Sequence, residues 1–135
     1  MGRKRTHDRG KVMATVCERI SQGETVEQVC AEIGVASRTV REWALEDAFA
    51  PLYARAREAQ AHAVAEQALT VAASAYGKSS EDIAATRLEV DTRKWFAAKL
   101  APKHYGERQA VEHTGAGGTP LRFTFAIGEP AQDDE

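Results

Sequence analysis

The chain has few cysteines and no long apolar run, the features that disulfide-rich scaffolds and membrane anchors require. Its 135 residues include only two cysteines, and its apolar runs are far shorter than the roughly 20 residues of a membrane-spanning helix. The charged N-terminus is not followed by an apolar signal-peptide core. Cys17 and Cys30 fall in predicted helices among apolar neighbours, without a metal-ligand spacing. We therefore expect a soluble cytosolic protein, with no membrane partner, whose cysteines are reduced core residues.

Groups that serve catalysis or nucleotide binding are also scarce. The glycine-rich segment 114–120 lacks the lysine of a phosphate-binding loop, and we interpret it as a flexible linker. The three acids at 133–135 are adjacent at a terminus and form a solvated tail. The four histidines are dispersed along the chain: His7, His62, His104 and His113. The sequence therefore predicts a protein that is not an enzyme and has no metal site or cofactor.

What the chain does contain is the spacing of a helix-turn-helix at residues 26–45, VEQVCAEIGVASRTVREWAL. Gly34 falls where a first helix must stop and the backbone must turn, a position that often needs a positive φ. Ser37 is placed to cap a second helix, in which Val40 and Trp43 face inward. The outer, N-terminal part of that helix would meet a DNA major groove with Ser37, Arg38, Thr39, Arg41 and Glu42.

Two features upstream extend this unit. Apolar residues at helical spacing predict a first helix over residues 11–21, with Gly23 as its stop. Ahead of it, residues 1–10 form a basic arm whose positive charge extends to Lys11. The arm could lie along phosphates or in a minor groove, or it could be a solvated terminus. Its single acid, Asp8, is set against Arg3, Lys4, Arg5, Arg9 and Lys11.

Residues 48–106 predict an antiparallel hairpin of two long helices. The first spans 48–76 with Pro51 in its first turn, and the second runs from Glu81 to about Ala101, before Pro102. The first helix is expected to present one stripe of mostly small side chains: Phe49, Leu52, Tyr53, Ala56, Ala59, Ala63, Ala68, Val71 and Ala75.

A two-helix hairpin has no closed core, so its bulky apolar groups need another surface. We favour self-association over a hairpin that folds back on the N-terminal helices to form one monomeric bundle. The residues expected at the oligomerisation surface are Leu52, Ala56, Ala63, Val71, Leu88, Trp95, Phe96 and Leu100.

The segment 121–127, LRFTFAI, alternates apolar and other residues and predicts a single β-strand. A lone strand needs partners. It could pair with copies from neighbouring subunits through residues such as Phe123 and Phe125, or stay disordered until another protein adds it to a sheet.

Residues 91–95, Asp-Thr-Arg-Lys-Trp, and residues 98–106, Ala-Lys-Leu-Ala-Pro-Lys-His-Tyr-Gly, carry a family resemblance. Over about residues 10–108 the chain resembles the small subunit of tailed-phage DNA-packaging terminases. The resemblance implies a ring of about eight to ten identical subunits in the host cytoplasm. It further implies that the ring binds double-stranded DNA at the viral packaging-initiation site. It also implies that the ring recruits and regulates the large ATPase-nuclease subunit.

Together these patterns predict a mainly α protein in four parts. They are the basic arm at 1–10, the helix-turn-helix at 11–47, the oligomerisation hairpin at 48–106, and a linker, strand and acidic tail at 107–135 that contacts the large subunit or forms an intersubunit barrel. A dimeric helix-turn-helix transcription regulator or a transposase DNA-binding module is the alternative, and a tri-helical adaptor without DNA contact is a third. Whether DNA would thread the ring or wrap around it stays open.

Overall fold

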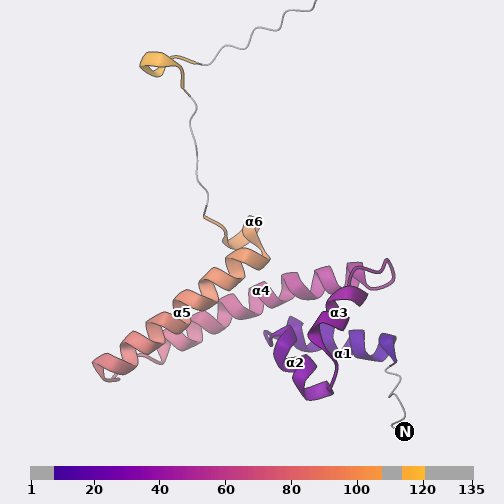
Figure 1. The fold of residues 1–135 in the computed structure, drawn as a ribbon. Coiled ribbons are helices and arrows are strands. Elements are labelled where there is room, and N and C mark those ends of the chain that lie inside the picture. The colour runs from indigo at the N-terminus through magenta and orange to yellow at the C-terminus, as the bar shows by residue number, and fades with distance from the viewer. Residues whose placement is uncertain (1–7, 108–113, 121–135) are drawn as a thin grey trace, which may run out of the picture.

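The computed structural model describes residues 8–107 and 114–120 and is mainly helical (Figure 1). Within these residues no named strand occurs, which agrees with a mainly α fold; the strand expected at 121–127, with Phe123 and Phe125, lies outside them. Segment 114–120, expected as a linker, closes into a turn. The helices are α1 (Arg9–Ser21), α2 (Val26–Ile33), α3 (Ser37–Trp43), α4 (Ala50–Ala73), α5 (Ser80–Leu100), α6 (Pro102–Tyr105) and the 3-10 turn η1 (Ala116–Gly118).

The first three helices surround one apolar core. Each helix supplies side chains that are fully buried, and Cys17 and Cys30 are buried among them as free thiols, as predicted. Burial raises the pKa of both thiols, so they stay protonated. The largest buried side chains of this core are Met13, Val16, Ile20, Val29 and Val40.

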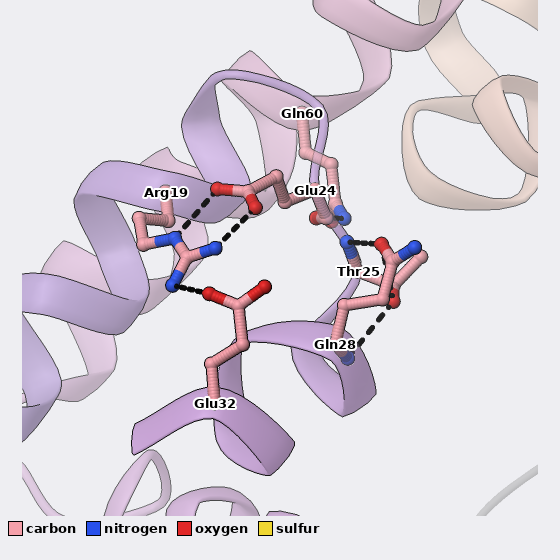
Figure 2. Close-up of polar contacts among 6 residues, drawn as sticks. All are labelled: Arg19, Glu24, Thr25, Gln28, Glu32 and Gln60. Atoms are coloured by element: carbon pink, nitrogen blue, oxygen red, sulfur yellow. Dashed lines mark hydrogen bonds and ion pairs between the residues drawn. The ribbon is translucent and has the colours of Figure 1, made fainter.

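Local signals at the helix ends explain where α1 and α2 begin. The Asp8 side chain accepts a hydrogen bond from the Lys11 backbone N–H (3.2 Å) and caps α1, which therefore begins at Arg9 rather than at residue 11. Thr25 and Gln28 form a reciprocal capping box at the start of α2 (Figure 2). Arg9 and Lys11 thus belong to a helix and not to an extended arm.

The turn between α2 and α3 is partly as predicted. Gly34 ends α2 in the left-handed conformation (φ +74°), as its position required. The prediction that Ser37 caps α3 is wrong, because the N-cap is Ala36, which makes no side-chain cap bond. Ser37 instead lies in the first turn, where its hydroxyl accepts a hydrogen bond from Arg41 Nη1 (3.3 Å).

Helices α4 and α5 form the expected antiparallel hairpin (Figure 1). Pro51 lies in the first turn of α4, and Ser79 caps α5 by accepting from the Asp82 backbone N–H (3.2 Å). The buried positions between the hairpin helices are small, Ala61 and Ala97 among them, which allows the two backbones to approach closely.

The expected stripe along α4 is only partly correct. α4 packs on α1 as well as on α5, so its buried side chains are spread over two faces. Ala56 joins the core of the N-terminal helices, which removes it from the predicted oligomerisation surface. The five buried residues of α4 are Ala56, Gln60, Ala61, Val64 and Ala68, of which only Ala56 and Ala68 belong to the expected stripe.

A polar junction ties the loop between α1 and α2 to α4 (Figure 2). The Gln60 side chain is fully buried, and its Nε2 donates to the Glu24 carbonyl oxygen (2.6 Å). Its Oε1 accepts from Arg57 Nη1 (2.8 Å), so both ends of the amide are bonded. The bond to the Glu24 carbonyl, together with the packing of α1 on α4, holds the N-terminal helices on the hairpin.

Arg19 stabilises the same loop from the other side (Figure 2). Its guanidinium donates two hydrogen bonds to the Glu24 carboxylate, one of them from Nε (2.7 Å), and its Nη1 lies 2.6 Å from Glu32. These bonds lower the pKa of the Glu24 carboxyl and raise that of Arg19. The loop therefore carries a bidentate ion pair on one side and a buried amide on the other.

No helix in the described ranges is both long and apolar enough to cross a bilayer.

We predict that Gln60→Ala lowers the free energy of unfolding by about 1–3 kcal/mol, because it removes a buried hydrogen bond at the junction. Chemical denaturation followed by circular dichroism at fixed protein concentration measures the change. Gln67→Ala is the control, since Gln67 is only half-buried and its amide donates a longer bond to the Gln22 carbonyl (3.4 Å). A Gln60→Ala loss no greater than that of Gln67→Ala would contradict the role given to the junction.

Candidate nucleic-acid interface

Helix α3 presents a polar face to solvent and an apolar face to the core. Val40 is fully buried and Trp43 packs half-buried against the same core, as predicted from their spacing. On the opposite side the Arg38 side chain is 89 % exposed, and Arg41 and Glu42 are also exposed. The predicted DNA-contacting residues of α3 are therefore brought together on one face, with Ser37 and Thr39 half-buried at its edge.

The two arginines of α3 are held by acidic neighbours. Arg38 Nε lies 3.0 Å from Glu42 one turn later, and Arg41 Nη2 lies 2.6 Å from Glu27 on α2. The hydrogen bonds from Arg41 and then from Ser37 lower the pKa of the Glu27 carboxyl. Both ion pairs are solvent-exposed, and such pairs contribute only about 0–1 kcal/mol. Phosphate oxygens or guanine edges can therefore replace these carboxylates at small cost.

The start of α1 lies beside the end of α3, a neighbour that the sequence did not indicate. Arg9 Nη1 is 3.0 Å from Glu46, and the Arg9 guanidinium lies 5.3 Å from the centre of the Trp43 ring. These contacts place Arg9 next to α3. Of the two candidate DNA-contacting residues on α1, Arg9 therefore lies at the interface, whereas no contact in the described ranges places Lys11 there.

The helical part of the candidate interface is not basic. Residues 8–47 carry eight acidic side chains against five basic ones: Arg9, Lys11, Arg19, Arg38 and Arg41. The positive charge of the N-terminal region thus depends on Arg3, Lys4 and Arg5, which lie outside the described residues. Attraction to a phosphate backbone therefore rests on local arginines and on this terminal segment, not on the net charge of the helices.

The hairpin leaves apolar side chains uncovered. Leu88 and Trp95 on α5 are 69 % and 60 % exposed, and Leu52 on α4 is also exposed. In the described chain the helices that pack on α5 are α4 and α6, and they leave these side chains exposed. Ile83, one of the bulky apolar groups expected on the second helix, is exposed on the same hairpin, as is Leu69, which the sequence did not single out. The other predicted oligomerisation residues in the described ranges, Ala63, Val71, Phe96 and Leu100, are half-buried.

The expectation of dispersed histidines is wrong for two of the four. α6 packs on α5 and its side chains reach α4, so that the His62 and His104 rings lie 5.3 Å apart, centre to centre. Glu58 lies one helical turn before His62, and its carboxylate is 3.5 Å from His104 Nε2. A carboxylate and an imidazole four residues apart on a helix was the sequence signal that could have indicated this cluster.

Comparisons with known proteins agree with this architecture. A family model described as "Bacteriophage Sf6, terminase small subunit-like" matches residues 8–112. Two crystal structures of the terminase small subunit gp1 of the bacterial virus Sf6, each with a single substitution, match at 30 % sequence identity with TM-scores of 0.66 and 0.65. Each covers 87 % of this chain, which spans 92 % and 91 % of theirs. A comparison with curated proteins gave no match. The chain belongs to the family of terminase small subunits similar to that of bacteriophage Sf6.

Proposed function

We propose that this chain binds the viral packaging-initiation DNA through α3 and recruits the large terminase subunit to it. The observation that carries the proposal is the exposed pair Arg38 and Arg41 on the outer face of α3, within a helix-turn-helix that belongs to a terminase family. A recognition helix meets the major groove with its N-terminal residues, where such side chains read guanine edges or bind phosphates.

The hairpin assembles the subunits into a ring. Leu88 and Trp95 on α5 would be costly to leave in water, and α4 and α6, the helices that pack on α5 in the described part of the chain, leave both exposed. A neighbouring copy supplies a matching apolar surface, and repetition of one head-to-tail contact closes a ring. Leu52, Leu69 and Ile83 extend this surface along the hairpin.

The ring has no enzymatic activity of its own and acts in the host cytoplasm. It positions the DNA and regulates the large subunit, which supplies the ATPase and nuclease activities. Residues 107–135 carry six acidic against two basic side chains, a charge that keeps this segment away from DNA and free for the large subunit. Phe123 and Phe125 lie in this segment and either pair between subunits or join a sheet of the large subunit.

We predict that the double substitution Arg38→Glu/Arg41→Glu weakens binding to double-stranded DNA at least about 30-fold, since each arginine contact contributes about 1–3 kcal/mol. Fluorescence anisotropy of a labelled duplex at fixed ionic strength measures the affinity. Lys78→Glu/Arg87→Glu is the control, because it changes the charge equally on exposed residues of the hairpin. Unchanged DNA binding by the α3 variant would exclude α3 as the recognition helix and favour the adaptor alternative.

Glu27→Gln should act in the opposite direction. The substitution removes the carboxylate that holds Arg41, together with one negative charge at the candidate interface. We expect DNA binding about two- to tenfold tighter, because an exposed ion pair of about 0–1 kcal/mol no longer competes with phosphate. Glu81→Gln on α5 serves as the matched control in the same anisotropy titration. Weaker binding by Glu27→Gln would mean that Glu27 orients Arg41 for DNA rather than competing with it.

Removal of residues 109–135 should leave the number of subunits in the assembly and the DNA affinity unchanged while it abolishes stimulation of the large subunit's ATPase. The acidic segment follows the hairpin in the sequence and does not include the α3 residues. Steady-state ATP hydrolysis by the large subunit, with and without the truncated protein, measures the effect. Full stimulation by the truncated protein would overturn the assignment of this segment to the large subunit.

A further inference from the structure

Three candidate metal-ligating side chains meet where α6 packs on the hairpin. Glu58 and His62 project from successive turns of α4, and His104 comes from α6. One ligand atom from each residue lies within 4.8 Å of the other two. None of the contacts proposed above for DNA, for neighbouring subunits or for the large subunit uses this cluster.

The spacing fits a small tetrahedral ion. In a zinc site with bonds of about 2.0–2.2 Å, adjacent ligand atoms lie about 3.3–3.6 Å apart. His104 Nε2 and Glu58 Oε1 are already separated by 3.5 Å. All three side chains are exposed, so small rotations bring the third ligand atom to the same separation.

The backbone around α6 fixes the position of His104. Ala101 is buried and its N–H donates to the Ala97 carbonyl (2.9 Å), which joins α6 firmly to α5. Gly106 then donates to the Pro102 carbonyl (2.9 Å). A Cβ on Gly106 would lie 2.5 Å from that oxygen, so the tight end of α6 requires glycine. The ligand from α6 is therefore held by main-chain contacts and not by the cluster alone.

Tyr105 supports the second histidine. Its hydroxyl oxygen lies 2.7 Å from His62 Nδ1, and the two rings meet edge to face. Histidines that ligate metals commonly make such a bond with their second ring nitrogen, which orients the ring. The neighbouring Arg57 guanidinium bonds to Gln60 and lies over the Phe96 ring (5.8 Å). These contacts direct its positive charge away from the three candidate ligands.

We propose that Glu58, His62 and His104 bind a divalent transition-metal ion, with Zn²⁺ as the best fit. Two imidazoles and one carboxylate form a donor set suited to Zn²⁺, Ni²⁺ or Cu²⁺ and unsuited to Mg²⁺ or Ca²⁺, which take oxygen ligands. Three protein ligands leave one position for water. The ion would join α6 to α4 and so set the direction in which residues beyond 107 leave the hairpin. This proposal does not depend on the function proposed above.

The test uses the full-length protein, freed of metal by chelation and titrated with Co²⁺ and then with Zn²⁺. We expect about one saturable site per chain, with visible Co²⁺ absorption that lacks a thiolate charge-transfer band because Cys17 and Cys30 are buried elsewhere. His62→Ala and His104→Ala should each weaken binding more than about tenfold, and Tyr105→Phe by up to about tenfold. Zn²⁺ should raise the Tm of the wild type and not that of the histidine variants.

The double variant His7→Ala/His113→Ala is the matched control and should bind like the wild type. If a histidine variant alters the helical circular dichroism, Glu58→Gln takes its place in the metal titration, because it keeps the shape of the side chain while it removes the carboxylate ligand. The proposal is overturned if the wild type binds no ion, if binding survives both His62→Ala and His104→Ala, or if a thiolate band shows that the cysteines are the ligands.

Discussion

The buried hydrogen bond between Gln60 and the Glu24 carbonyl is the interaction on which the use of this fold depends. It joins the loop between α1 and α2 to the hairpin, and Arg19 holds the other side of that loop through Glu24 and Glu32 (Figure 2). A helix-turn-helix on a flexible linker would sample many orientations, whereas the buried bond from Gln60 and the packing of α1 on α4 restrict this unit. The orientation of the exposed α3 face is therefore set by the attachment of the N-terminal helices to α4. Subunits joined through their hairpins would present their α3 helices in a repeated orientation.

The electrostatics of α3 favour selection over general attraction to DNA. Residues 8–47 carry more acidic than basic side chains, and the α3 arginines are paired with Glu27 and Glu42. If α3 binds DNA as proposed, phosphates or guanine edges replace these exposed pairs at small cost. The excess of acidic side chains in residues 8–47 then limits the general attraction of this unit to a duplex.

Local signals made much of the fold predictable. Gly34, Pro51 and Pro102 act within a few residues of chain, so their effects on helix ends can be deduced from the sequence. The wrong predictions concern side chains whose burial or partners depend on segments far away in the sequence. The stripe on α4 was placed wrongly because α1 and α5 cover different faces of that helix. Gln60 and the His62–His104 cluster went unnoticed because their partners lie 36 and 42 residues away and only the packed structure brings them together.

In the proposed ring, copies of this chain cover the apolar residues of α5 and so assemble the units that carry α3. Native mass spectrometry of the full-length protein over a range of concentrations tests it most directly, with Trp95→Glu measured alongside. We expect one discrete species of about eight or more subunits for the wild type and smaller species for the variant. A wild-type dimer would favour a transcription regulator, and a monomer at every concentration would contradict the account.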